Sequence, residues 1–279
     1  MQKKLFRNLS LVMMTGLLIV SSSACGKSKG SNGITATSDT AIPASEAFAE
    51  EGIWFYADEP VTKDTEIDAI LVFDGNGNVT HYITNCGGVK IKFSDLRDLS
   101  NDEILELAKE KDKESYEFEM QVIAGKGDNA IEEIQLSIGN STDPEFIAEM
   151  QKSLNANQLM RSKVDPSDYK EPQANPYTLK IETDGTGNQT AKETIEYSYT
   201  EVYYTGEVGY TFNPSLEENG EEWTPYRETK STITLYPSAG ATTVYDMQFL
   251  SCGYLSQKIE GEHPGIVLDT PDTKGIKVD

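Results

Sequence analysis

Short runs of apolar and β-branched residues recur along the chain, and clusters of Gly and Asn separate them. In the first half these runs occupy residues 52–56, 67–73 and 79–83. Asp74-Gly-Asn-Gly-Asn78 lies between the last two runs. Glycine tolerates the positive φ of tight turns, and Asp or Asn side chains bind the backbone there. The pattern therefore predicts a β-hairpin with its turn at this cluster.

The second half of the chain repeats this pattern. Asp184-Gly-Thr-Gly-Asn188 has the same turn signal between two further β-prone runs. Because Gly, Pro and Asn clusters separate a series of such runs, this half predicts a sandwich or a partly closed barrel. The expected strands are 177–183, 190–207, 209–212, 230–236, 243–254 and 266–268.

The stretch between the two hairpins has a helical pattern. Ser100 precedes two acids and a run of apolar residues, which predicts a capped helix of about three turns. Asp143 and Pro144 predict the start of a second helix. The stretch 115–138 between them is ambiguous, because the alternation of apolar residues over 116–122 favours a strand whereas the residues that follow fit either a strand or a helix. The expected fold class is α+β, a β-rich fold of antiparallel hairpins with two or three helices in the N-terminal half.

Residues 164–176 contain three prolines and few apolar side chains, which predicts a loop. This loop is the expected boundary between an N-terminal α+β region at 51–165 and a C-terminal β-rich region at 166–279. The two regions could also form one domain.

The first 24 residues have the features of an export signal. Three basic residues and no acid precede an apolar run at 9–20, which is short for a spanning helix. The Ser22-Ser-Ala-Cys25 that follows resembles the lipobox of bacterial lipoproteins, with Ser22 where Leu is commonest. This resemblance implies cleavage after Ala24 and lipidation of Cys25. An ordinary secretory signal cut near Ala24 would instead leave a free Cys.

The segment after Cys25 is rich in Gly, Ser, Thr and Ala over residues 26–48. Such a composition cannot offset the entropy lost on ordering. We therefore expect residues 25–50 to be a flexible tether, with the lipid bilayer as a partner through the Cys25 anchor. The expected location is the extracytoplasmic side of the cell membrane.

The formal net charge of the chain is −22. Nucleic acid and anionic lipid headgroups would repel such a protein, so nucleic acid is excluded as a partner. Cations, cationic proteins and neutral molecules such as glycans remain as partners. We prefer solubility at a crowded surface as the explanation of the charge, because a net charge alone is not a binding site.

Two cysteines follow the anchor, Cys86 and Cys252. Outside the membrane they could form a disulfide that closes a long loop and stabilises the fold by roughly several kcal/mol. Each could instead be a small buried hydrophobe. Their spacing does not decide between these alternatives.

The two Asp-Gly-x-Gly-Asn clusters could also bind calcium. Asp74, Asn76 and Asn78 occupy alternate positions, as the first ligands of a calcium loop do, and Asp184 opens the second cluster. The sequence lacks the Gly, the Glu and the flanking helices of an EF-hand. We therefore prefer hairpin turns, with a calcium-dependent surface adhesin as the weaker alternative.

Tyrosines gather in one expected strand. Tyr197, Tyr199 and Tyr203 would share one face, where they could stack against sugar rings or form half-buried cross-strand pairs. Gly52-x-Trp54 resembles the Gly-x-Trp that opens lipocalin-like barrels, but we prefer to interpret Trp54 as a core aromatic residue on a first strand.

Catalytic groups are sparse. The two histidines, His81 and His263, form no zinc pair. Ser167-x-x-Lys170 fits the nucleophile motif of penicillin-binding enzymes without the Lys-Thr-Gly strand that they need. The many acidic residues leave a glycosidase pair open without indicating one. We therefore predict no catalytic residue, no metal and no cofactor.

Residues 52–82 and 265–279, together with Ala24-Cys25-Gly26, resemble parts of the uncharacterised surface lipoproteins of Firmicutes. This resemblance implies a Gram-positive cell surface and carries no established activity. We expect a membrane-anchored module that binds an extracellular protein or glycan. A cell-wall or glycan-processing hydrolase is the alternative, and a purely structural surface protein is a third class.

Overall fold

The computed structural model describes part of the chain, and residues 34–279 form one compact unit. The described residues are 41–202, 226–238, 240–261 and 265–278. The predicted export signal, Cys25, Tyr203 and His263 lie outside them.

The folded part begins earlier than the sequence predicts. Ile42–Pro43 forms β1 and Ala44–Ala49 forms α1, both within the expected tether. Phe48 is fully buried, with its ring centroid 4.6 Å from that of Trp54. A large buried ring therefore orders a segment whose composition predicts flexibility. The tether expected over 25–50 must end before β1.

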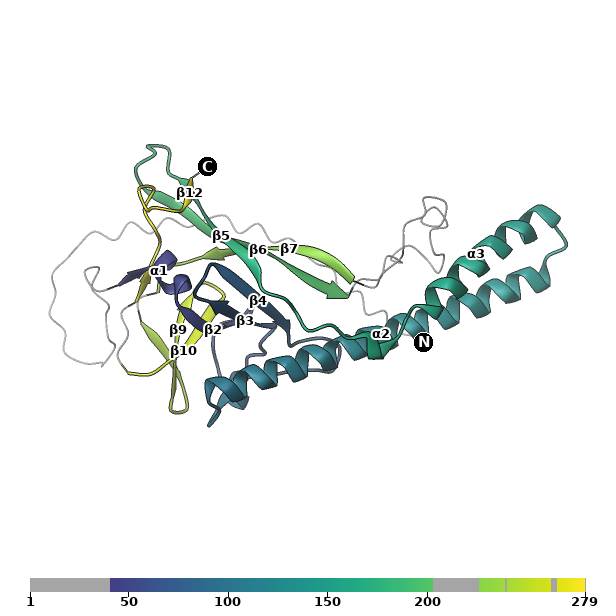
Figure 1. The fold of residues 1–279 in the computed structure, drawn as a ribbon, viewed down its shortest axis with the longest axis horizontal. Helices are drawn as coiled ribbons and strands as arrows, with labels where there is room; N and C mark the ends of the chain where they lie inside the picture. Colours follow the sequence, from purple (N-terminus) through teal and green to yellow (C-terminus); the bar gives the residue numbers. More distant parts are fainter. Residues whose placement is uncertain (1–40, 203–225, 239, 262–264, 279) are drawn as a thin grey trace. The chain divides into compact units, whose positions relative to one another are not determined.

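Most strands belong to a single ten-stranded sheet (Figure 1). Its order is β7-β6-β5-β4-β3-β2-β10-β9-β8, and neighbours on this path are antiparallel. β12 adds to β5 in parallel, and β1 pairs separately with β11 in parallel. The strands are β2 Glu51–Tyr56, β3 Ala69–Asp74, β4 Asn78–Ile83, β5 Asn175–Thr183, β6 Thr190–Val202, β7 Tyr226–Leu235, β8 Ala241–Val244, β9 Met247–Cys252, β10 Leu255–Ile259, β11 Ile266–Val267 and β12 Lys277–Val278.

The sheet crosses the expected domain boundary. β4 pairs with β5, which joins the regions 51–165 and 166–279 in one sheet. Trp54 from the first region packs in the same core cluster as Ile195 and Leu235 from the second. The two regions are therefore parts of one domain.

The central strands bury both of their faces. Successive side chains of a strand point to opposite sides, so Trp54 belongs to one core cluster and Phe55 to the other. The first cluster joins the central strands to α1 and β5–β7. The second joins them to α2 and to the 3-10 helix η1, Phe93–Leu96. The α+β prediction is confirmed, and within the described residues the end strands β7 and β8 do not pair, so the sheet stays open.

Both predicted hairpin turns are confirmed. β3 and β4 pair around residues 74–78, and β5 and β6 pair around 184–188. In the first turn, the Asp74 carboxylate accepts the backbone N–H of Asn76 at 2.7 Å and of Asn78 at 3.0 Å. The side chain of Asp74 therefore completes the turn.

Replacing Asp74 with Ala is expected to lower the melting midpoint, because the turn loses this acceptor. Hydrogen bonds from the Asn78 side chain and from the backbone hold the pKa of Asp74 below its usual range. The wild type should therefore lose the stability that ionised Asp74 gives to the turn as the pH falls through this lowered pKa. Thermal melts in EDTA and in millimolar calcium are expected to coincide. A calcium-dependent rise that Asp74→Ala or Asp184→Ala abolishes would establish a metal site instead.

Both predicted helices begin where the sequence indicates. Ser100 caps α2, Asn101–Asn140, because its Oγ accepts the N–H of Glu103 while the Glu103 carboxylate accepts the N–H of Ser100. Asp143 caps α3, Pro144–Ser162, by accepting the N–H of Glu145 at 3.0 Å. These caps occupy donors that a helix start otherwise leaves unpaired.

The length predicted for α2 is wrong, as is the strand over 116–122. α2 spans 40 residues and includes that stretch. Tyr116, Met120 and Ile123 are buried at intervals of four and three residues, which is the spacing of a helix face. Beyond the sheet, α2 continues as a pair with α3 (Figure 1).

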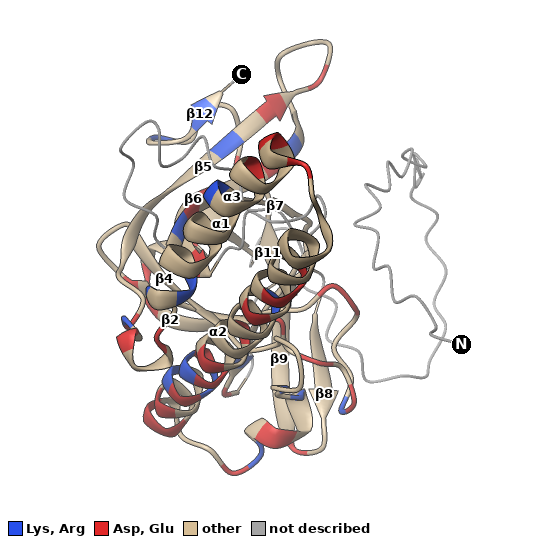
Figure 2. Ribbon diagram, turned by 90° about the vertical axis from the view of Figure 1, so that its right-hand side faces the viewer, with Lys and Arg blue, Asp and Glu red and all other residues tan. Residues whose placement is uncertain are grey.

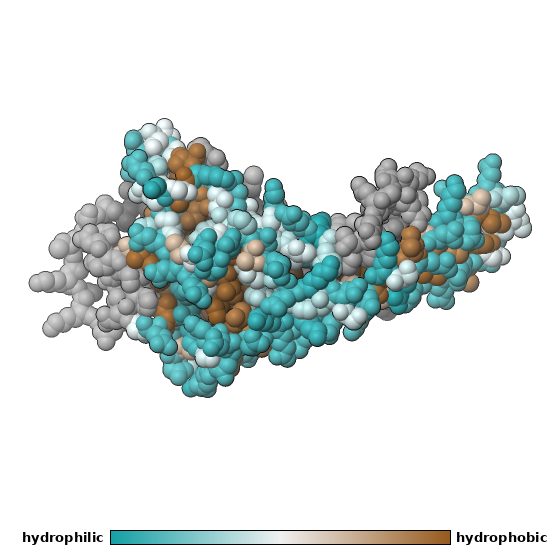
Figure 3. All heavy atoms as spheres, in the orientation of Figure 1, coloured by the Kyte–Doolittle hydropathy of each residue, from teal (hydrophilic) through white to brown (hydrophobic). Residues whose placement is uncertain are grey.

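Charged residues are frequent along the exposed side of α2 (Figure 2). Apolar side chains also show along the α2–α3 pair (Figure 3), and Leu136 of α2 and Phe146 and Leu159 of α3 are exposed. Among the described residues, no helix is both long enough and apolar enough to cross a membrane.

Candidate functional site

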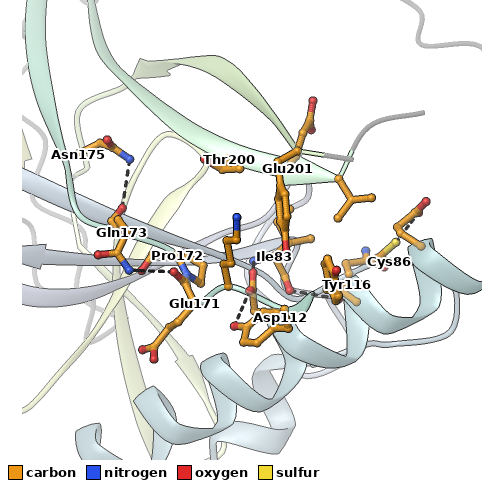
Figure 4. A pocket seen from close by; sticks show the side chains of 17 residues that line it. Ile83, Cys86, Asp112, Tyr116, Glu171, Pro172, Gln173, Asn175, Thr200 and Glu201 are labelled. Atoms are coloured by element: carbon orange, nitrogen blue, oxygen red, sulfur yellow. Dashed lines mark hydrogen bonds between the residues drawn. The ribbon is translucent and has the colours of Figure 1, made fainter. Parts of the chain in front are cut away.

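A cavity of about 500 Å³ lies where α2 approaches the sheet (Figure 4). Its walls come from α2, from the end of β4 and the residues after it, from residues 169–175, and from the adjoining ends of β6 and β7. Residues 169–175 follow the 3-10 helix η2, Pro166–Asp168. The volume is in the range of small-molecule sites.

One face of α2 forms the floor of this cavity. Asp112, Ser115, Tyr116 and Glu119 line it, and their spacing of three and four residues places them on one side of the helix. Ser115 Oγ donates to the carbonyl of Ile83 at 3.2 Å, and Asp112 Oδ1 accepts the N–H of Ile83 at 2.7 Å. These two bonds fasten the helix to the end of β4.

Three tyrosines form one wall. The rings of Tyr116 and Tyr226 stack with centroids 5.8 Å apart and an interplanar angle of 10°, and Tyr169 lies 5.6 Å from Tyr116. The hydroxyls of Tyr116 and Tyr226 donate to the backbone carbonyls of Asp165 and Asp168. These bonds hold the polar ends and leave the rings to line the cavity. We call this cavity the tyrosine pocket.

Asp112 is a buried carboxyl group of the tyrosine pocket, with 8 % of its surface exposed. Oδ2 accepts the hydroxyl of Tyr169 at 2.9 Å, and Oδ1 accepts the N–H of Ile83. Burial raises the pKa of Asp112 to about 6, while both hydrogen bonds favour the ionised form. Asp112 therefore places a negative charge in the pocket at neutral pH.

The thiol of Cys86 donates to Glu119 Oε1 at 2.8 Å. Burial, together with this bond, raises the pKa of Cys86 to about 12. Because the thiolate is the reactive form, Cys86 is not an activated nucleophile. The disulfide with Cys252 is not formed, since both thiols are free. Cys252 is instead buried in the core cluster that contains Trp54, whereas Cys86 lines the pocket.

Further charges surround the opening. Glu171 and Glu201 add two carboxylates, and Lys170 is the one basic side chain among the described lining residues. Lys170 Nζ lies 5.0 Å from the ring centroid of Tyr226, over its face. Arg227 pairs with Glu201 at 3.0 Å. The lining is therefore predominantly acidic.

Tyr197 and Tyr199 do not form an exposed platform for sugars, and the alternative of buried or half-buried structural packing holds for both. Tyr197 is 5 % exposed, and its hydroxyl lies 3.0 Å from Nδ1 of His81. Tyr199 stacks on the His81 ring with centroids 4.0 Å apart. Burial lowers the pKa of His81 to about 3, so this ring is neutral. Tyr197 and Tyr199 pack β6 against β4, and Tyr203 lies outside the described residues.

The carboxylates of the calcium candidates Asp74 and Asp184 accept hydrogen bonds from residues of their own turns. Asp74 accepts from Asn76 and Asn78, and the Asp184 carboxylate accepts the N–H and hydroxyl of Thr186. Within the described part of the chain, no three His, Cys, Asp or Glu side chains converge to hold a metal ion.

The Ser-x-x-Lys pair is not assembled as a nucleophile and base. Ser167 lies in η2, and its hydroxyl donates to Asp165 Oδ1 at 2.8 Å. Lys170 lies over the Tyr226 ring. Ser167 therefore binds Asp165 and Lys170 contacts Tyr226, so the two side chains do not act as a nucleophile and its base.

The sequence patterns do not predict the tyrosine pocket. Asp112 carried a usable signal, because it stands four residues after Ala108 and four before Tyr116 on the buried face of α2. A charged residue in such a stripe is unusual, since buried charges need partners. The signal was lost because the helix was expected to end near this residue.

Comparisons with protein family models, with curated proteins and with solved structures found no match for this chain. The expected membership among Firmicutes surface lipoproteins therefore stays a prediction.

Proposed function

We propose that the chain is a lipid-anchored protein on the extracytoplasmic side of the cell membrane, which binds a small ligand in the tyrosine pocket. Cys25 is the anchor, and the residues between it and β1 are the tether. The observation that carries the binding function is the pocket, a cavity of about 500 Å³ with preformed polar groups. Groups that are already held in place lower the entropic cost of binding.

A glycan-processing hydrolase is the second candidate, and the pKa of Asp112 is the observation that favours it. A carboxyl group with a pKa of about 6 suits general acid catalysis. Both oxygens of Asp112, however, accept hydrogen bonds from Ile83 and Tyr169. This arrangement favours a fixed charge over a group that passes protons to a substrate. Cleavage of purified cell wall that Asp112→Asn abolishes would support the hydrolase.

The anchor is tested by metabolic labelling with a clickable palmitate analogue. The wild type is expected to carry the label, and Cys25→Ala is expected to lose it. Cys86→Ala is the matched control and should stay labelled. Equal labelling of Cys25→Ala and the wild type would exclude Cys25 as the lipidated residue.

The pocket is tested by filling it. Thr200 lines the cavity and is exposed on β6, so Thr200→Trp should occupy the space without disturbing the core. Thr242→Trp on β8 is the control, because Thr242 is also exposed and lies outside the lining. A ligand at about 100 times its Kd adds about 2.7 kcal/mol to stability. In a thermal-shift screen of amines, sugars and amino acids, Thr200→Trp should lose that gain and Thr242→Trp should keep it. Ligands that stabilise both variants equally would place binding elsewhere.

A further inference from the structure

The charge of the tyrosine pocket is one-sided. Four carboxyl groups line it against one ammonium group, in a chain with a net charge of −22. Such a pocket has a negative potential, which attracts cations and repels anions. The four are Asp112, Glu119, Glu171 and Glu201.

Two of these carboxyl groups have no counter-charge within the described part of the chain. Glu171 and Glu201 each form an ion pair with a neighbouring basic side chain, whereas Asp112 and Glu119 form none among the described residues. Asp112 is also the more deeply buried of these two. A buried carboxylate without a cation is disfavoured by desolvation, and a cation placed beside it offsets that cost. The floor of the pocket is therefore complementary to a positive group.

The aromatic wall already holds a positive group. Lys170 Nζ lies 5.0 Å from the centroid of Tyr226, within the range of a cation–π contact. The Tyr226 ring is itself stacked on Tyr116, so its position is fixed. Lys170 is exposed, which means that its ammonium group can leave this place without breaking the core. It occupies the position that an alkylammonium group of a ligand would take.

From these observations we propose that the tyrosine pocket selects a small alkylammonium compound such as a diamine. This inference rests on the proposed binding function. One ammonium group contacts the Tyr226 face in place of Lys170, and another approaches Asp112 and Glu119. A neutral sugar would use the rings and bring no positive charge to the two carboxylates. An anionic ligand would be repelled by them.

The first experiment compares two ligands of similar length that differ in charge. Calorimetric titration of the full-length protein in neutral detergent uses cadaverine and its uncharged counterpart 1,5-pentanediol. Cadaverine is expected to bind at least about tenfold more tightly, since one of its charges faces the carboxylates and the other the Tyr226 ring, where the diol has neutral hydroxyls. Its affinity should fall as salt rises, because part of the pocket is open to solvent. Equal affinity for the two ligands, or no binding of cadaverine at millimolar concentration, overturns the proposal.

A variant of Lys170 tests the proposal through an expected gain in affinity. Lys170→Gln removes a competing cation from the Tyr226 face, so cadaverine should bind roughly five times more tightly. Lys152→Gln removes the same charge from an exposed site on α3, outside the pocket, and should leave the affinity unchanged. Weaker or unchanged binding by Lys170→Gln would show that Lys170 does not occupy the ligand's position.

The filled variant separates this inference from the binding function. N-acetylglucosamine that binds the wild type but not Thr200→Trp, together with no binding of cadaverine, overturns the amine specificity and leaves the binding function standing. Cadaverine that still binds Thr200→Trp places the amine site outside the pocket and overturns the amine inference. The binding function fails as well if no ligand of the screen distinguishes Thr200→Trp from the wild type.

Discussion

Replacing Glu193 with Gln is expected to raise the free energy of unfolding at pH 8 by on the order of 2 kcal/mol. Glu193 lies in β6 and is fully buried. Its Oε2 accepts the N–H of Asp269 at 2.8 Å, while Oε1 is buried without a hydrogen-bond partner. A Gln amide keeps the first bond and removes the charge, so the variant avoids a cost that the wild type bears.

The sign follows from the pKa of Glu193. Burial, and to a smaller extent the neighbouring Asp269, raise it from 4.5 to about 8. The unfolded chain therefore releases this proton at lower pH than the folded protein does, and stability falls as pH rises between these values. Below pH 6.5 the lowered pKa of His81 gives the opposite slope. The effect of Glu193 is therefore clearest between pH 6.5 and pH 8.

Urea unfolding at several pH values measures this effect. Between pH 6.5 and 8 the wild type should lose about 1 to 2 kcal/mol relative to Glu193→Gln. Glu228→Gln is the control, because Glu228 is exposed on β7 and its replacement also removes one negative charge. Parallel curves for Glu193→Gln and the wild type would mean that Glu193 has no raised pKa.

Replacing Gly253 with Ala is expected to destabilise the protein by about 2 to 5 kcal/mol, through two separate causes. Gly253 has φ +70° in the turn between β9 and β10, a conformation that disfavours a side chain. An added Cβ would also lie 2.7 Å from the carbonyl oxygen of Thr234 in β7. A backbone oxygen of a paired strand cannot move aside, so the turn or the strand must shift.

Gly77→Ala isolates the first cause. Gly77 has φ +87° in the turn between β3 and β4, and its added Cβ would meet nothing within 4 Å. We expect it to cost about 1 to 2 kcal/mol in urea unfolding at pH 7, well below the cost of Gly253→Ala. Equal costs for the two variants would contradict the close approach of the β9–β10 turn to β7.

Local sequence was sufficient for the turns and the helix starts. Glycine at positive φ and Asp at the first position act within five residues, so the hairpins at Asp74 and Asp184 follow from their own residues. The caps at Ser100 and Asp143 likewise bind groups two or three residues away. Interactions of such short range are present in the sequence pattern itself.

The conformation of residues 116–122 and the order of α1 depended on the parts of the protein that they pack against. The apolar residues over 116–122 allow both a period of two and a helical spacing, and α2 became helical where that spacing faces the sheet. Phe48 lies in a stretch of small residues, and the order of α1 comes from its contact with Trp54. Phe48 also contacts Phe73 and Tyr177, and these residues, like the strands that α2 faces, are distant in sequence, so neither outcome could be obtained from a local window.

The acidic charge and the α+β alternation of hairpins and helices can be obtained from the order of residues alone, because each depends on composition or on near neighbours. The export signal is a prediction from the same kind of local pattern. The tyrosine pocket depends on folding. Its three tyrosines, Tyr116, Tyr169 and Tyr226, come from a helix, a loop and a strand separated by more than a hundred residues from first to last. Only the docking of α2 on β4 brings their rings and the charge of Asp112 together.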